Sequence, residues 1–200
     1  MKLTSALGAT ALYILLLLAT YFVHVTWFQV NVVFYAAIAD AVIAAFVAAL
    51  ILFLPGCFTR LGQFEKLLIV VIWLLGGYSF AISVPTVLDR SLSFYILEKL
   101  QQRGGGIRKD AFAQVFTQEY VKEHRLVDVR LTEQLESGTI EIRNGCVLLT
   151  EKGQHFAQAS RYFRQHLLPK KRLLMGEYSD DLTDPFRHSE ASPDYQCNGQ

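Results

Sequence analysis

Cysteine is scarce in this 200-residue sequence, and its three copies, Cys57, Cys146 and Cys197, lie far apart. The sequence contains no Cys-x-x-Cys pair and no His-x-His pair. This spacing favours neither a disulfide framework nor a zinc site, so we expect no bound metal. Cys146 falls on a predicted strand, where we expect it to act as a small buried apolar side chain. That expectation agrees with a reducing, cytoplasmic setting for the C-terminal half.

Motifs for catalysis are also missing. The Gly104-Gly105-Gly106 run follows a predicted helix and precedes Ile-Arg-Lys. A phosphate-binding loop follows a strand and ends in Lys and Ser or Thr, so this run does not fit. The histidines are scattered without a recognisable acid, base or nucleophile beside them. We therefore predict no catalytic residues, no cofactor and no enzymatic activity.

Charge is nearly absent from residues 1–88, which hold only five charged side chains: Lys2, Asp40, Arg60, Glu65 and Lys66. Residues 90–175 carry 15 Lys or Arg against 9 Asp or Glu, and residues 176–200 carry 6 acids against one Arg. This asymmetry predicts a membrane domain over residues 1–88, a soluble domain over 89–175 and a disordered acidic tail over 176–200. The basic surplus permits contact with nucleic acid or anionic lipid but does not require it.

Three long apolar runs cover residues 7–28, 32–54 and 67–88. Each is long enough to cross a hydrocarbon core of about 30 Å as a helix. Pro55-Gly56 ends the second run, since both residues break helices. A cleaved signal peptide is the alternative for the first run, but no small-x-small cleavage site follows it cleanly, and we expect a retained helix. The chain is thus predicted to be a multi-pass protein of the inner or plasma membrane.

The orientation is predicted from the positive charges beside the membrane. Three spans place the termini on opposite sides, and positive charge collects on the cytoplasmic side. The N-terminal side has Lys2, Arg60 and Lys66, and the C-terminal side has Arg90, Lys99, Arg103 and Arg108. We therefore predict a cytoplasmic C-terminal domain.

Asp40 lies inside the second apolar run, where a charge costs roughly 2.5–3.5 kcal/mol on insertion scales. A stripe of small residues follows the same helix face: Ala36, Ala37, Ala44 and Ala48. We expect Asp40 to point into a helix interface, either protonated or bonded to a hydroxyl of Tyr78, Ser79 or Ser83. An assembly contact is favoured over a proton or substrate relay, because His24 is the only other titratable partner.

The stretch 139–153 predicts a tight hairpin that leads into a helix. Ile140 and Ile142 alternate with charged residues, Asn144-Gly145 is a type I′ turn signal, and Thr150 suits an N-cap. Helices are predicted over residues 92–103, 109–123, 127–136 and 151–168. Core positions of the first are Leu92, Ile96, Leu97 and Leu100.

This order of three helices, a hairpin and a helix resembles a winged helix-turn-helix domain over residues 92–168. The Leu149-Thr150-Glu151-Lys152-Gly153 run, followed by Phe156, adds to the resemblance. The whole chain is therefore predicted to be mainly α, with three transmembrane helices before a small α+β winged-helix domain. The resemblance implies a fold and no single function, because winged helices bind DNA, RNA and proteins.

In a DNA-reading winged helix, the third helix enters the major groove. The candidate contact residues for nucleic acid or a partner are Arg125, Arg130, Thr132, Gln134, Arg143 and Asn144. Asp128, Glu133 and Glu136 share that short helix and would be repelled by phosphates. We therefore expect Arg125 and Arg130 to pair with these acids and the domain to contact protein.

Our leading hypothesis is a non-catalytic accessory or assembly protein. It binds a larger integral membrane protein through the alanine face and the Gly76-Gly77 region, and its winged helix contacts that partner or a cytoplasmic protein. The absence of a linker between residues 88 and 91 supports docking at the bilayer surface. The alternatives are a membrane-tethered winged-helix transcriptional regulator that binds DNA and, less favoured, a membrane enzyme or permease subunit centred on Asp40.

Overall fold

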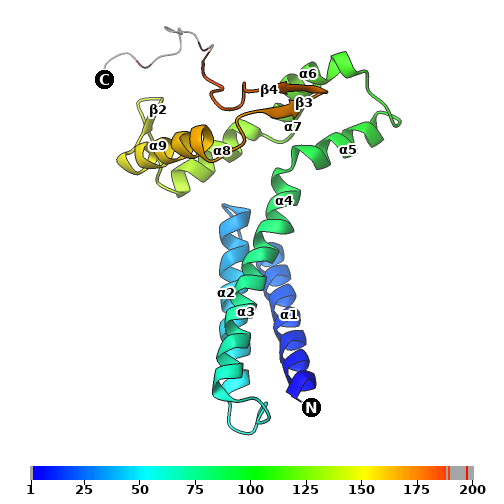
Figure 1. The fold of residues 1–200 in the computed structure, drawn as a ribbon, viewed down its shortest axis with the longest axis vertical. Helices are drawn as coiled ribbons and strands as arrows, with labels where there is room; N and C mark the ends of the chain where they lie inside the picture. Colours follow the sequence, from blue (N-terminus) through cyan, green and yellow to red (C-terminus); the bar gives the residue numbers. More distant parts are fainter. Residues whose placement is uncertain (1, 188, 190–196, 198–200) are drawn as a thin grey trace. The chain divides into compact units, whose positions relative to one another are not determined.

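The computed structural model describes residues 2–187, 189 and 197 and is mainly helical (Figure 1). Its first three helices are α1 (Lys2–Trp27), α2 (Val33–Phe53) and α3 (Gln63–Ser83). After Val84, the short helix α4 (Pro85–Arg90) continues the third apolar segment. All three segments are long and apolar enough to cross a membrane, which confirms the prediction of three such helices.

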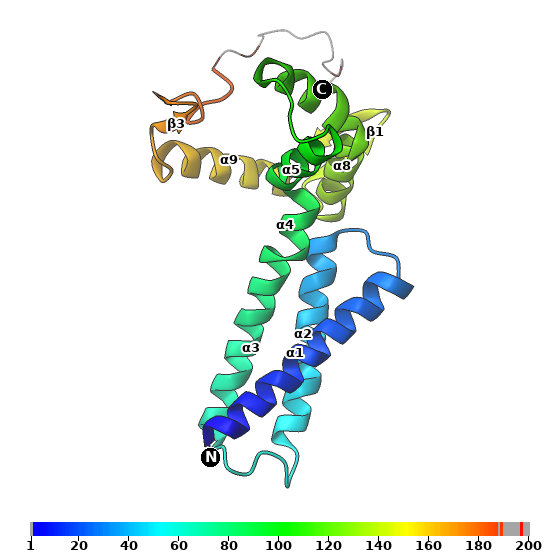
Figure 2. The same ribbon diagram turned by 90° about the vertical axis from the view of Figure 1, so that its right-hand side faces the viewer.

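The three long helices pack side by side, with α2 antiparallel to its neighbours in sequence (Figures 1 and 2). Alanines on α2 allow close approach, and Tyr13 stacks on Trp73 with ring centroids 5.2 Å apart. The Tyr13 hydroxyl donates to the Trp73 carbonyl oxygen at 2.8 Å, and the Trp73 indole donates to Thr10 at 3.1 Å. Contacts between α1 and α3 therefore satisfy the Tyr13 hydroxyl and the Trp73 indole.

The alanine stripe of α2 is buried inside this bundle. Ala37, Ala44 and Ala48 are fully covered, Ala36 is half-buried, and Gly77 packs against Tyr13 and Ala41. Gly76 is exposed. The prediction that this stripe is a free face for a partner is therefore corrected: the chain's own helices cover it.

Gly77 provides a test of this packing. A Cβ there would lie 2.7 Å from the Ala41 Cβ and still closer to the Tyr13 hydroxyl, whereas one at Gly76 meets nothing within 4 Å. We expect Gly77→Val to destabilise the bundle by about 1–3 kcal/mol through overpacking. Thermal unfolding in detergent measures the loss, and Gly76→Val is the matched control with the same helix-propensity change. Equal melting temperatures for the two variants would contradict the packing.

Beyond the bundle, α5 (Leu92–Gln102) precedes a continuous helical segment from Lys109 to Glu123. This segment comprises η1 (Lys109–Ala111), α6 (Phe112–Gln114), the π-helical η2 (Val115–Tyr120) and α7 (Val121–Glu123). Tyr95, Val115 and Tyr120 form the centre of a second apolar cluster. The predicted core face of α5 is wrong in part, because Tyr95 and Lys99 are buried whereas Leu92 and Leu97 are exposed.

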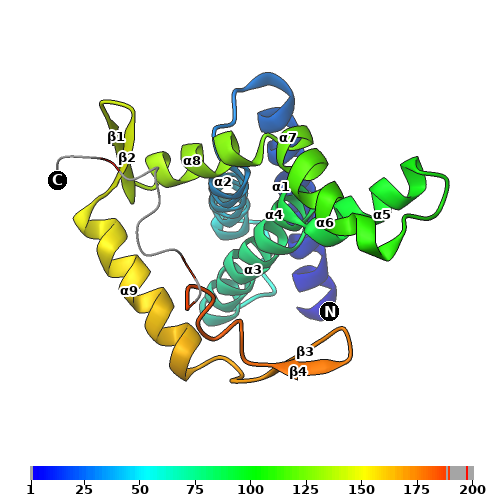
Figure 3. The same ribbon diagram turned by 90° about the horizontal axis from the view of Figure 1, so that it is seen from above.

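The chain forms two compact units, Met1–Val129 and Arg130–Gln200. The boundary between them in the sequence falls within α8 (Leu126–Glu136). The predicted boundary lies earlier, at residue 88. The second unit contains β1 (Ile140–Arg143), β2 (Cys146–Leu149) and α9 (Glu151–His166). A second hairpin, β3 (Arg172–Leu174) and β4 (Glu177–Ser179), follows α9 (Figure 3). The winged-helix arrangement of these parts stays a prediction.

The β1–β2 hairpin has the predicted form. Its strands are antiparallel with Ile142 opposite Val147, and Asn144 and Gly145 have φ of 52° and 79°. Thr150 caps α9 as predicted, because its hydroxyl accepts from the Gly153 amide at 3.0 Å. A Cβ at Gly153 would collide with the Thr139 backbone carbonyl, so only glycine lets α9 approach the hairpin this closely.

The C-terminal part differs from the prediction in two respects. Cys146 is bonded to Cys197 in a disulfide, so the expectation of a reduced, buried Cys146 is wrong. Ordered strand extends to Ser179, inside the stretch predicted to be disordered. Residues 188, 190–196 and 198–200 of the predicted tail lie outside the described residues.

Candidate functional site

The most unusual polar contact of the bundle joins His24 and Asp40. His24 Nδ1 lies 2.8 Å from Asp40 Oδ1, which connects the end of α1 to the second turn of α2. The Asp40 side chain is 2% exposed and that of His24 is 28% exposed. The second carboxylate oxygen of Asp40, Oδ2, is buried without a hydrogen-bond partner in the described part of the chain. His24 is therefore the group that compensates this buried carboxylate.

A small pocket of about 240 Å³ lies between the end of α1 and the start of α2, lined by neighbours of His24 and Asp40 in sequence: Tyr21, Val25, Phe28, Val30, Val33 and Ala36. Phe28 also meets the His24 ring edge-on, at 5.8 Å between centroids.

The sequence places Asp40 correctly in a helix interface but names the wrong partners. The predicted hydroxyl donors Tyr78, Ser79 and Ser83 are all exposed on α3. The observed partner, His24, was available from the sequence as the only histidine of the first two spans. Its spacing from Asp40 across the short α1–α2 connection is the signal that could have identified it.

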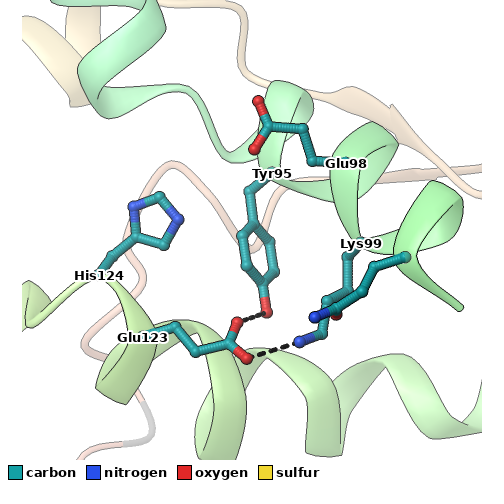
Figure 4. A pocket seen from close by; sticks show the side chains of 6 residues that line it. Tyr95, Glu98, Lys99, Glu123 and His124 are labelled. Carbon is teal, nitrogen blue, oxygen red and sulfur yellow. Dashed lines mark hydrogen bonds and ion pairs between the residues drawn. The ribbon is translucent and has the colours of Figure 1, made fainter.

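A second polar cluster lies outside the three spans, where α5 meets the η2–α7 segment (Figure 4). The Lys99 ammonium contacts Glu119 at 2.7 Å and Glu123 at 2.6 Å, and the Tyr95 hydroxyl donates to Glu123 at 2.9 Å. Arg103 also contacts Glu119, at 2.9 Å. These residues adjoin a pocket of about 290 Å³ lined by Tyr95, Glu98, Lys99, Gln102, Glu123 and His124. These ion pairs join α5 to the η2–α7 segment, and we call them the clamp.

This clamp should make the packing of α5 on the η2–α7 segment depend on pH. Hydrogen bonds from Lys99 and Arg103 lower the pKa of Glu119, and bonds from Lys99 and Tyr95 lower that of Glu123, below the usual 4.5. The same bonds raise the pKa of Lys99 above its usual 10.5. The carboxylate contribution is therefore complete above about pH 4.5 and is lost as pH falls through the lowered values. The lysine contribution is complete below 10.5 and is lost as pH rises through its raised value.

Chemical denaturation of the full chain between pH 3 and 7 tests this dependence. We expect Glu119→Gln/Glu123→Gln to flatten the acid limb, while Glu98→Gln, on the same pocket but outside the network, keeps it. An unchanged acid limb in the double variant would contradict the assignment.

The residues proposed for nucleic-acid contact are largely engaged within the protein. Arg125 pairs with Asp128, Arg130 with Glu133 and Arg143 with Glu141, each at 2.8 Å. The expected pairing of Arg125 and Arg130 with acids of the same helix is thus confirmed. The Gln134 side chain accepts from the Thr139 hydroxyl, and Asn144 forms the hairpin turn.

One face of the β1–β2 hairpin is apolar and open. Cross-strand register places Ile140 opposite Leu149 and Ile142 opposite Val147, so these four side chains share a face. Ile142, Val147 and Leu149 are 49%, 45% and 53% exposed. Within the described residues of the Arg130–Gln200 unit, Gly153 alone is buried, so this unit has no apolar core of its own.

No protein-family model, no curated protein and no solved structure matches this chain. The fold and the contacts described above are therefore the basis of any functional assignment. They define a chain with three helices long and apolar enough to span a membrane, followed by smaller helical and hairpin elements.

Proposed function

We propose that this chain is a non-catalytic integral membrane protein that binds a larger protein partner through its C-terminal unit. The three long helices support insertion, because their outward faces carry large apolar side chains such as Phe46, Leu50 and Leu75. Such surfaces suit lipid, and every backbone group in a helix is satisfied internally.

The proposal of a protein partner rests on the exposed apolar face of the β1–β2 hairpin. A strand pair with one apolar face needs packing against another surface to be stable in water. No described residue of its own unit buries Ile142, Val147 or Leu149, which stay 49%, 45% and 53% exposed. Apolar side chains at the centre of an exposed patch are typical of protein interfaces. We therefore assign the partner contact to this hairpin face and no longer to the alanine stripe.

The ion pairs favour a protein partner over DNA. A DNA-reading surface needs arginines that are free to contact phosphates and base edges. Arg125, Arg130 and Arg143 each have a carboxylate at 2.8 Å, and these carboxylates would lie beside the DNA phosphates and repel them. The membrane-tethered transcriptional regulator accordingly stays the second candidate, supported by the resemblance alone.

The orientation is part of the proposal. Four basic residues flank the C-terminal side of the spans against three on the N-terminal side, which supports a cytoplasmic C-terminal unit. The Cys146–Cys197 disulfide weighs against it, because disulfides persist mainly in oxidising compartments. Protease accessibility of the C-terminal unit in sealed, oriented vesicles decides between the two sides.

Cross-linking and gentle-detergent purification of the full chain from native membranes tests the partner. We expect a stoichiometric partner with the parent chain, its loss in Ile142→Ser/Val147→Ser, and its retention in Glu141→Ser/Arg143→Ser on the opposite hairpin face. An identical set of proteins with both variants would contradict the hairpin assignment. Duplex binding by the intact chain that weakens steeply with salt would favour the regulator instead.

A further inference from the structure

Helix α9 is amphipathic, and its apolar stripe is uncovered. Phe156, Phe163 and Leu167 recur at intervals of seven and four residues, which places them on one face. They are 62%, 52% and 62% exposed. Ala159 lies between them on the same face and is also exposed. This stripe is separate from the apolar hairpin face, which consists of strand residues.

From Lys152 onward, the charge of α9 and of the run after it has one sign. Between Glu151 and Glu177 the sequence has no acidic residue and six basic ones: Lys152, Arg161, Arg164, Lys170, Lys171 and Arg172. Arg161, Lys170, Lys171 and Arg172 are exposed. Arg164 lies over the Phe186 ring at 5.8 Å. Beyond Glu177, the next acids, Asp180 and Asp181, are held by Arg187 at 3.2 and 3.6 Å, so part of their charge is already balanced.

We propose that α9 and the basic run after it bind the anionic surface of the membrane that holds α1, α2 and α3. A helix with phenylalanine and leucine on one face and a basic polar face is the form that lies in the headgroup region. The aromatic stripe enters the acyl boundary, and the lysines and arginines meet lipid phosphates or carboxylates. This inference rests on the membrane insertion in the proposed function and is independent of the protein partner.

The charge of this segment favours anionic lipid over a protein surface as its binding partner. A protein surface complementary to this segment would need a matching acidic patch, whereas anionic lipid supplies negative charge along the whole helix. Each basic residue near an anionic surface changes the partitioning by about fivefold, so two neutralised lysines should lower the ratio of docked to free helix by roughly 25-fold. The effect should weaken as salt screens the surface charge.

The test uses the full chain in nanodiscs, with a nitroxide at Ala159→Cys in a Cys57→Ser background and the Cys146–Cys197 disulfide kept intact. A matched label at Gln158→Cys sits off the stripe. In discs containing phosphatidylserine, we expect the label at 159 to be accessible to oxygen and shielded from a water-soluble nickel complex, and the label at 158 to stay aqueous. In pure phosphatidylcholine discs, both labels should be aqueous.

Three variants make the outcome specific. Phe156→Ser/Phe163→Ser should release the helix, Lys170→Gln/Lys171→Gln should lower docking by roughly 25-fold, and Arg143→Gln should change nothing. An aqueous label at 159 in phosphatidylserine discs would overturn the proposal. A label at 159 shielded equally in both lipids and in detergent would also overturn it, because protein would then cover the stripe. Failure of the chain to enter nanodiscs at all would instead refute the membrane insertion in the proposed function.

Discussion

His24→Leu is expected to destabilise the three-helix bundle by about 1–3 kcal/mol, the usual cost of leaving a buried hydrogen-bonding group without its partner. The Asp40 side chain is 2% exposed, and its Oδ2 already lacks a hydrogen-bond partner among the described residues. Without the imidazole, neither oxygen would be compensated. Reversible unfolding in mixed micelles measures the change in the free energy of unfolding.

The variant that replaces both residues of the pair is the control for His24→Leu. In His24→Leu/Asp40→Leu both polar groups are gone, and replacement of a buried pair by apolar residues is often neutral or stabilising. We therefore expect the double variant to be more stable than His24→Leu. If the double variant were instead less stable by the sum of the two single losses, the residues would act independently and the pair would not be a functional unit of the bundle.

Cys146→Ser is expected to destabilise the C-terminal unit by about 4 kcal/mol. The disulfide to Cys197 joins residues separated by 51 positions, and closing a loop of that length removes about this much chain entropy from the unfolded state in the loop-closure model. The unit has no apolar core among its described residues, so the cross-link is a large part of what holds it. Denaturant unfolding of the full chain, followed by a probe on α9, measures the loss.

The unpaired Cys57 is the matched control, and Cys57→Ser should leave the unfolding midpoint unchanged. Non-reducing mass spectrometry of the chain taken directly from native membranes shows whether the Cys146–Cys197 bond is formed there. A reduced pair in a chain of full stability would contradict the predicted loss and would favour the cytoplasmic orientation.

Local sequence alone predicted most elements of this protein, although not the β3–β4 hairpin. The apolar runs predicted three long helices, because only a helix can carry some twenty consecutive apolar residues across lipid. Asn144-Gly145 predicted the hairpin turn, because glycine and asparagine tolerate positive φ, and Thr150 predicted the cap of α9. The pairing of Arg125 and Arg130 with acids of the same helix followed from a spacing of three residues. Each of these features depends on residues close together in the chain.

Tertiary structure decided which faces are covered and which polar groups meet. His24 and Asp40 lie on different helices, so their 2.8 Å contact depends on how α1 and α2 pack. The burial of Lys99 between Glu119 and Glu123 changed part of the expected core face of α5, because a paired lysine can be buried where an unpaired one cannot. The Cys146–Cys197 bond joins residues 51 positions apart, which spacing could not reveal. Periodicity shows that a face is apolar, but the surface that covers it is set by distant parts of the chain.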